Sequence, residues 1–135
     1  MSLIKWSSEL SVEIEIIDAQ HKKLIAMINK LDAAMRLGKG RDLTEKILDE
    51  LVEYTRKHFS AEEEYFTKFG YPFTAQHVKE HIAFIKKIEK FQANFEKEKL
   101  TLSTKIVDFL SDWLRDHIQG TDKKYVRFFH QKGLH

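Results

Sequence analysis

The chain repeats apolar and polar positions with the period of an α-helix over most of its length. Apolar side chains recur at steps of three and four residues in four stretches, at about 18–37, 42–69, 74–98 and 102–119, a spacing that places them on one face of a helix. A shorter amphipathic stretch at about 122–131 predicts a short C-terminal helix. The first 17 residues differ, because Val12, Ile14 and Ile16 alternate with polar residues, as in an extended leader that lies on an apolar surface.

Capping and turn residues separate these stretches. Side chains suited to start a helix precede or open the first three stretches, and glycines follow the ends of the first, second and fourth. The predicted caps are Asp18, the pair Asp42 and Glu45, and Thr74, and the predicted stops are Gly38-Lys-Gly40, Gly70 with Pro72, and Gly120 in a left-handed conformation. Because the loops are too short to join parallel neighbours, we expect an all-α, up-down-up-down four-helix bundle in a single domain, 1–135.

Composition excludes several classes of function. The 135 residues include 33% charged and 42% hydrophobic side chains, with a formal net charge of +2, which is typical of one globular domain. No basic run is interleaved with aromatic residues, so we expect no nucleic-acid partner, and no apolar stretch is long enough to span a membrane. The chain starts without the apolar core of a secretory signal, so we expect a cytoplasmic protein. The absence of cysteine excludes disulfides and iron–sulfur clusters.

Six polar residues interrupt the apolar stripes of the four helices. They are His21 in the first, His58 and Glu62 in the second, His77 and His81 in the third, and His117 in the fourth. In an up-down-up-down bundle, the starts of the first and third helices lie beside the ends of the second and fourth. The topology therefore predicts that all six side chains meet at one end of the bundle interior.

Such a gathering favours a metal site over ordinary packing. A single histidine in a stripe is usually a hydrogen-bonded core residue, but five imidazoles and a carboxylate must all be satisfied. The stripes offer no lysine or arginine to pair with Glu62, and an unpaired buried carboxylate costs several kcal/mol. His77 and His81, like His58 and Glu62, are spaced i, i+4, so each pair shares one helix face.

Counting the donors favours two metal ions. Asp122 follows His117 by five residues, too far for the same α-helical face, although a turn at Gly120 could return it; taken alone, it is more typical of a helix cap. Glu63 and Glu64 point away from the stripe and are interpreted as a solvated face. Five imidazoles and two carboxylates exceed the six donors of one octahedral ion. Two ions that share both carboxylates and an oxygen bridge from water would leave one position vacant for a small ligand. These donors suit iron, with manganese or zinc as alternatives, although zinc prefers four-coordinate sites.

These residues resemble the hemerythrin family, in its single-domain bacterial form. The matching segments cover almost the whole chain, including the leader. They are Ile17-Asp-Ala-Gln-His21-Lys-Lys-Leu24, His58-Phe-Ser-Ala-Glu62-Glu63, His77-Val-Lys-Glu-His81, and Trp113-Leu-Arg-Asp-His117-Ile118 with Asp122.

The resemblance implies a non-haem di-iron centre with an oxo or hydroxo bridge. It implies that His77, His81 and His117 bind one iron, that His21 and His58 bind the other, and that Glu62 and Asp122 bridge them. It further implies that dioxygen binds reversibly at the two-histidine iron, in an apolar pocket formed by Leu24, Phe59, Trp113, Leu114 and Ile118. His130 and His135 match no ligand and are expected on the surface. Glu13 stands where many relatives have glycine.

The resemblance therefore favours oxygen transport, storage or delivery over catalysis. An oxygen-consuming enzyme is a candidate recipient, and we expect a monomer. The alternatives are an oxygen or redox sensor and a di-iron oxidase, peroxidase or nitric oxide reductase; iron storage is a weaker option for a single bundle. Ferritin-like di-iron enzymes use Glu-x-x-His pairs, and no histidine here has a glutamate three residues before it. Sensors of this family usually carry a signalling domain, which we do not expect here.

Overall fold

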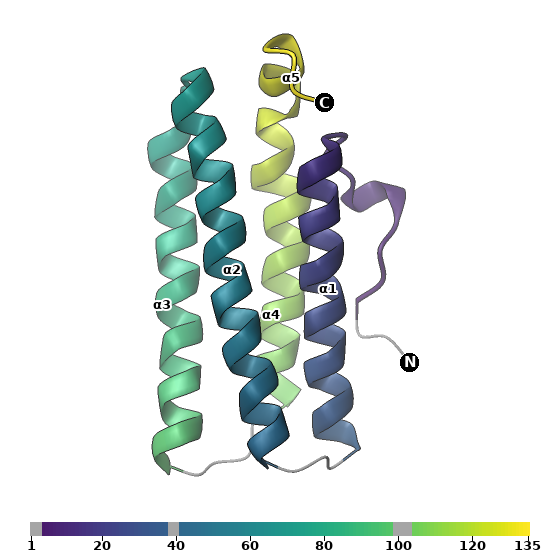
Figure 1. Cartoon of the computed structure of the whole chain (residues 1–135), viewed down its shortest axis with the longest axis vertical. Coiled ribbons are helices and arrows are strands. Elements are labelled where there is room, and N and C mark those ends of the chain that lie inside the picture. Colours follow the sequence, from purple (N-terminus) through teal and green to yellow (C-terminus); the bar gives the residue numbers. More distant parts are fainter. Residues whose placement is uncertain (1–3, 38–40, 99–103) are drawn as a thin grey trace.

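The computed structural model describes residues 4–37, 41–98 and 104–135 and shows four long helices side by side (Figure 1). Helices α1 and α3 run in one direction and α2 and α4 in the other, which confirms the all-α, up-down-up-down bundle (Figure 1). The elements are η1 (Ser8–Leu10), α1 (Glu15–Arg36), α2 (Arg41–Phe69), α3 (Thr74–Glu98), α4 (Thr104–Asp116), the π-helical turn η2 (His117–Asp122) and α5 (Lys123–Gln131). The described residues form no β-strand, and none of their helices is long and apolar enough to cross a membrane.

The predicted apolar stripes form the core between the four helices. Leu31, Leu48, Ile88 and Leu110, from α1 to α4 in order, are each no more than 1% exposed. Burying a side chain of this size stabilises the fold by about 1.5–3 kcal/mol relative to leaving it exposed. The shared apolar interior thus holds the four helices in register and fixes the height at which their polar side chains meet.

The leader lies along α1, and its last residues differ from the extended segment that the sequence predicts. Val12 and Ile14 are fully buried, as expected, whereas Ile16 is 46% exposed because α1 already begins at Glu15. Asp18 is therefore not the N-cap. Its carboxylate lies within the first turn and accepts hydrogen bonds from the Val12 N–H (2.8 Å) and the Ser11 hydroxyl (2.5 Å), so it fastens the leader to the helix.

Glu13 adopts a left-handed backbone conformation, with φ of 55°. Glycine adopts this conformation without the steric cost that a Cβ atom brings. The Glu13 carbonyl accepts a hydrogen bond from His130 Nε2 at 2.8 Å. Glu13 therefore sits at a tight turn where glycine would be less strained.

The predicted helix ends are partly correct. Gly70 ends α2 with φ of 69°, and α3 begins at Thr74, whose hydroxyl donates to the Tyr71 carbonyl at 2.6 Å instead of capping a helix N–H. Asp42 lies in the first turn of α2, and Gly38–Gly40 lie outside the described residues. The stop predicted at Gly120 is wrong, because its φ is not positive and the chain continues through the wide turn η2 into α5, beyond the end of the bundle (Figure 1).

Candidate metal centre

Seven polar side chains gather in the interior near the end of the bundle where α1 and α3 begin. Each is at most 4% exposed; they are His21, His58, Glu62, His77, His81, His117 and Asp122. The structure thus brings together every residue that the sequence analysis named as a candidate metal ligand. Within the part of the chain that the structure describes, their donor atoms form two groups, each with all atoms within 4.8 Å of one another.

The larger group has three imidazoles and the smaller has two. The larger contains His77, His81 and His117 with both carboxylates, and the smaller contains His21 and His58 with Glu62. This partition of the histidines is the one that the family resemblance implies for the two irons.

The two carboxylates lie between the groups. Asp122 Oδ1 lies 2.9 Å from His77 Nε2 and 3.0 Å from His117 Nε2, while its Oδ2 lies 3.2 Å from His21 Nε2. Glu62 Oε1 lies 3.4 Å from His58 Nε2 and 3.3 Å from His81 Nε2. Each carboxylate therefore contacts at least one imidazole of each group, as a bridging ligand must: Glu62 contacts one of each, and Asp122 contacts two of the larger group and one of the smaller.

The turn η2 brings Asp122 to the site. In an α-helix, residues five apart lie on different faces, but a π-helical turn closes i to i+5 hydrogen bonds and is therefore wider. His117 and Asp122 are the first and last residues of this turn. The wide turn places both side chains on the interior face, so Asp122 reaches the cluster without a break in the helix.

Three histidines hydrogen-bond through Nδ1, their outer nitrogen, which points away from the centre of the cluster. Each partner lies on the preceding helix, directly next to a candidate ligand of that helix. Gln20 Oε1 on α1 lies 2.6 Å from His58 Nδ1 on α2. Glu63 on α2 lies 2.8 Å from His81 Nδ1 on α3, and Glu80 on α3 lies 3.1 Å from His117 Nδ1. Consecutive helical residues are about 100° apart, so the neighbour of an inward-pointing ligand faces the adjacent helix.

Glu63 is therefore not a simple solvated side chain, contrary to the sequence-based interpretation. It is 35% exposed, but one carboxylate oxygen fixes the orientation of His81. Sequence reasoning also missed Gln20, Glu80 and Tyr125. The available signal was adjacency: Gln20, Glu63 and Glu80 each directly precede or follow a stripe ligand.

Tyr125 holds the second oxygen of Glu62. Its hydroxyl donates to Glu62 Oε2 at 2.5 Å, and the tyrosine is fully buried. Burial, Asp122 and Glu62 raise the pKa of Tyr125 well above its usual value, so the phenol remains protonated and a donor. Tyr125 thus orients the carboxylate that faces both groups of histidines.

The donor atoms of the cluster fit a cation better than they fit one another. His81 and His117 direct their Nδ1 atoms at Glu63 and Glu80, which requires Nδ1 to carry a proton, so the Nε2 atom of each ring offers an inward lone pair whenever the ring is neutral. These two Nε2 atoms lie only 3.2 Å apart. In addition, Glu62 Oε1, both oxygens of Asp122 and the Nε2 atoms of His21 and His77, which face Asp122, are buried without a hydrogen-bond partner among the described residues. Metal ions at the centre would satisfy these converging lone pairs.

In the metal-free cluster, the pKa values of the buried groups also indicate an excess of negative charge at the centre. Burial lowers the pKa of His117, but Asp122, Glu62 and Glu80 outweigh burial and raise it to about 9. Burial lowers the pKa of His58 to about 4, because Glu62 offsets the desolvation only in part. Burial raises the pKa of Glu62, but His58 and His81 hold it at about 2, so the carboxylate stays ionised. Without metal, a proton on His117 balances part of that charge.

An apolar cavity adjoins the cluster. Its described lining is Leu24, Ile28, Leu51, Thr55, Phe59, Phe84, Ile88, Leu110, Trp113 and Leu114. The lining thus includes Leu24, Phe59, Trp113 and Leu114 of the predicted oxygen pocket, whereas Ile118 is fully buried outside it. The centre of a water-sized molecule has about 10 Å³ in which to move, about the least that one water needs. The Thr55 hydroxyl donates to the Leu51 carbonyl at 2.7 Å, so even this polar side chain offers little to water.

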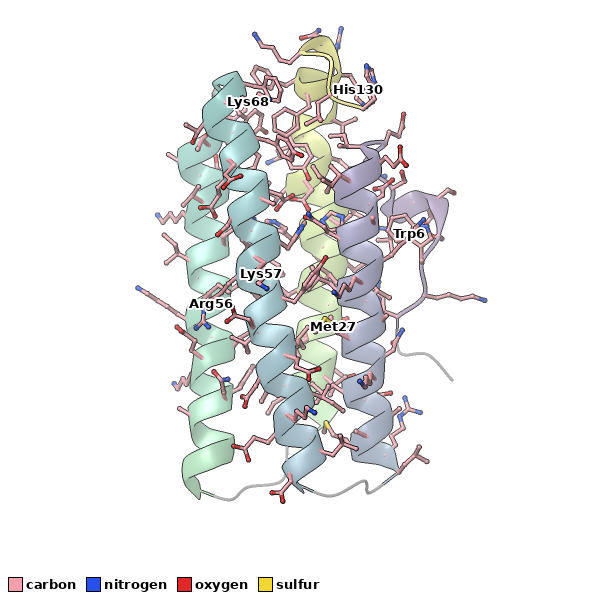
Figure 2. The ribbon with its side chains drawn as sticks, viewed as in Figure 1. Trp6, Met27, Arg56, Lys57, Lys68 and His130 are labelled. Carbon is pink, nitrogen blue, oxygen red and sulfur yellow. The ribbon has the colours of Figure 1, made fainter. Side chains whose placement is uncertain are left out.

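Two aromatic residues of that pocket pack on the larger group of histidines. The Phe59 ring stacks on His81 with centroids 3.7 Å apart, and Trp113 stacks on His117 at 4.4 Å. His130 and His135, by contrast, stack on each other at 4.6 Å, and Figure 2 shows His130 near the C-terminal end of the chain, at the periphery of the bundle. These last two histidines are therefore not members of the cluster.

Comparison with known proteins identifies the family. A family model described as the hemerythrin HHE cation binding domain matches residues 12–129. Bacteriohemerythrin of Stenotrophomonas maltophilia is 37% identical over 126 residues, which cover 93% of this chain and 81% of the relative; that of Clostridium acetobutylicum is 34% identical over 127 residues, covering 90% and 97%. A crystal structure of wild-type hemerythrin matches with a TM-score of 0.89 and 31% identity, covering 93% of this chain and 97% of that chain. The chain, with its buried histidine and carboxylate cluster, belongs to the hemerythrin family.

Proposed function

We propose that this protein holds two non-haem iron ions and binds dioxygen reversibly, for oxygen transport, storage or delivery. Members of the hemerythrin family bind non-haem iron, and they are mainly oxygen binders rather than enzymes. The observation that carries the proposal is the pair of carboxylates, Glu62 and Asp122, each of which contacts an imidazole from both groups of histidines. Two metal ions that share these carboxylates account for all seven buried donors.

The proposed ligands divide unequally. His77, His81 and His117 would hold one iron, His21 and His58 would hold the other, and Glu62 and Asp122 would bridge them. Ferrous iron supplies the reversible electron donation on which dioxygen binding depends. With this unequal division the iron held by His21 and His58 would have fewer protein ligands and the freer coordination position, so we assign the oxygen-binding side to it.

The surrounding residues favour a carrier over a catalyst. The described residues that line the adjoining cavity are all apolar or aromatic except Thr55, and none of them titrates. General acid or base catalysis would need a positioned group that exchanges protons, and an apolar lining excludes the water and protons that promote irreversible oxidation. This water-excluding lining would include Leu24, Phe59, Trp113 and Leu114. Ile118, which is fully buried outside the cavity, would pack behind it.

We further propose that the protein acts in the cytoplasm as a monomer and passes oxygen to an oxygen-consuming enzyme. A sensor or an enzyme would share the same ligands. The behaviour of the bound oxygen therefore separates these alternatives more directly than the metal content does.

Stopped-flow mixing of the anaerobic ferrous protein with dioxygen, followed by removal of oxygen, tests the proposal. A carrier should develop a visible charge-transfer absorption on mixing and should recover the ferrous spectrum on degassing, over many cycles. Accumulation of hydrogen peroxide with permanently oxidised iron, or consumption of a reducing substrate at catalytic rates, would instead identify an oxidase or a peroxidase. Elemental analysis should give two irons per chain, and one metal or mainly zinc would contradict the di-iron assignment.

A further inference from the structure

The outer hydrogen-bond partners of the histidines carry charge on one side of the centre only. Glu63 and Glu80, both carboxylates, accept from His81 and His117 in the larger group. In the smaller group, His58 is oriented by the neutral amide oxygen of Gln20, and no described residue hydrogen-bonds to the outer nitrogen of His21. The three-histidine side therefore has two outer carboxylates and the two-histidine side has none among the described residues.

This asymmetry is built into the positions of the three residues on their helices. Each follows or precedes a ligand directly, and each faces the ligand of the next helix at 2.6–3.1 Å. The hydroxyl of Thr121 in the turn η2 also donates to Glu80 at 2.9 Å, which holds this carboxylate beside His117. Because glutamine and glutamate have the same shape, the chemical difference among the three positions is one of charge.

A carboxylate that accepts the outer N–H makes an imidazole a stronger donor to a metal ion. Charge-assisted hydrogen bonds are about twice as strong as neutral ones, and a nearby negative charge stabilises Fe³⁺ more than Fe²⁺ by simple electrostatics. Glu63 and Glu80 are 35% and 37% exposed, so solvent screens part of their charge. Their hydrogen bonds to the rings nevertheless transmit the effect directly to the metal donors.

We propose that Glu63 and Glu80 lower the reduction potential of the three-histidine iron, and that Gln20, by being neutral, keeps the two-histidine iron at a higher potential. This inference rests on the proposed function, since it assumes that the cluster holds two irons. Gln20, Glu63 and Glu80 are then positioning residues that make the irons electronically unequal. A carboxylate at position 20 would favour the ferric state on the oxygen-binding side, which is the state that cannot bind dioxygen.

Three substitutions that preserve shape test the inference: Glu63→Gln, Glu80→Gln and Gln20→Glu. Each is made in the full-length, iron-loaded protein, and the midpoint potential is measured anaerobically with redox mediators. We expect Glu63→Gln and Glu80→Gln to raise a midpoint potential and Gln20→Glu to lower one. Removing an outer partner typically changes metal affinity about 10- to 100-fold, and a tenfold change in the Fe³⁺-over-Fe²⁺ preference corresponds to about 59 mV for one electron.

Glu64→Gln is the matched control, because Glu64 is exposed and adjacent to Glu63 and its substitution removes the same charge. If Glu64→Gln shifts the potential as much as Glu63→Gln, long-range charge explains the effect and the inference is overturned. It is equally overturned if the midpoint potentials of Glu63→Gln and Gln20→Glu equal those of the parent. Should Glu63→Gln lose iron, Gln20→Glu still decides, because it adds a charge and removes no ligand.

Iron content separates this inference from the proposed function. If the unaltered protein contains two irons and binds oxygen reversibly, but the three variants have the same midpoint potentials as the unaltered protein, the proposed function stands and this inference is overturned. Unaltered protein that binds no iron contradicts both. Gln20→Glu should also autoxidise faster than the parent, and a slower rate would contradict the role assigned to the neutral amide.

Discussion

His117 and Asp122 lie five residues apart in the chain, and His117 Nε2 is 3.0 Å from Asp122 Oδ1. A π-helical turn makes this contact possible, since an α-helix would direct the two side chains to different faces. The same turn contains Gly120, which the sequence suggested as a left-handed helix end. The contact between His117 and Asp122 therefore depends on the helix continuing through this glycine.

Gly120→Ala should preserve the centre and stabilise the fold. Gly120 does not have a positive φ, and a Cβ atom added there meets nothing within 4 Å. Because alanine is favoured over glycine within a helix by about 1 kcal/mol, thermal denaturation should show a higher melting temperature with an unchanged iron content. Gly70→Ala is the control: its φ of 69° should make alanine destabilising by about 1–2 kcal/mol. Loss of stability in Gly120→Ala would mean that the turn needs glycine after all.

The bundle and the candidate ligands could be predicted from the sequence because both follow from helical periodicity. The stripe that contains Leu31 also contains His21, and the stripe that contains Leu48 also contains His58. Because each helical residue adds a fixed rise, the two histidines are expected at the same level of the bundle. Asp122 was the weaker candidate until the family resemblance supported it, because α-helical spacing directs it to a different face from His117 and the sequence pattern did not identify the π-helical turn. Gln20, Glu63 and Glu80 were missed because their partners lie on other helices, and a helix pattern does not identify contacts between helices.

Glu62→Gln should weaken metal binding strongly. The substitution keeps the shape of the side chain but replaces an oxygen that faces both groups with a neutral amide. We expect iron content to fall below two per chain, measured by elemental analysis, together with a lower melting temperature, since metal binding contributes to folding. Glu64→Gln, an exposed neighbour, should leave both values unchanged. Equal iron contents in the two variants would show that Glu62 does not bind metal.

Glu13→Gly should stabilise the protein without affecting the centre. Glu13 has φ of 55°, a conformation that costs a residue with a Cβ atom about 1–2 kcal/mol. Part of this gain is lost because glycine also has a more flexible unfolded chain, so we expect a net gain of about 1 kcal/mol in the free energy of unfolding. Denaturant titration measures it, and an unchanged or lower midpoint would argue that the glutamate side chain compensates for the strain.

Metal binding should release a proton from His117. Its pKa of about 9 in the metal-free fold exceeds the unfolded value near 6.5, so the ring is protonated at pH 7 and must lose that proton to bind iron. The apparent affinity for ferrous iron should therefore rise about tenfold per pH unit from pH 7 to about 9 and then level off. His58, with its pKa of about 4, is already neutral over this range and adds nothing to the slope.

The same linkage sets how the stability of the metal-free protein depends on pH. The raised pKa of His117 stabilises this fold fully below pH 6.5, and the contribution is lost as the pH rises through about 9. Anaerobic iron titration in weakly buffered solution with an indicator dye measures the released proton. His130→Ala, which lies outside the cluster, should release the same amount, and an affinity that does not vary between pH 7 and 9 would contradict the prediction.

Leu114→Ala should make the bound oxygen less stable while retaining both irons. Leu114 is 4% exposed and lines the narrow apolar cavity beside the cluster, so its truncation enlarges a space that now has almost no room for water. Water and protons that enter promote irreversible oxidation of the iron. We therefore expect faster autoxidation, followed as the loss of the oxygenated spectrum with time. The substitution should also cost about 2–5 kcal/mol of stability, which makes a control of equal size necessary.

Leu31→Ala is that control. Leu31 is fully buried on α1 but does not line the cavity, whereas Leu51 does line it and is for that reason unsuitable. Leu31→Ala should lose a similar free energy of unfolding and should autoxidise at nearly the parent rate. If both variants autoxidise equally fast, general loosening of the bundle explains the effect and the cavity has no special role. If neither variant changes the rate, reversible binding does not depend on a dry cavity, and the enzyme and sensor alternatives gain support.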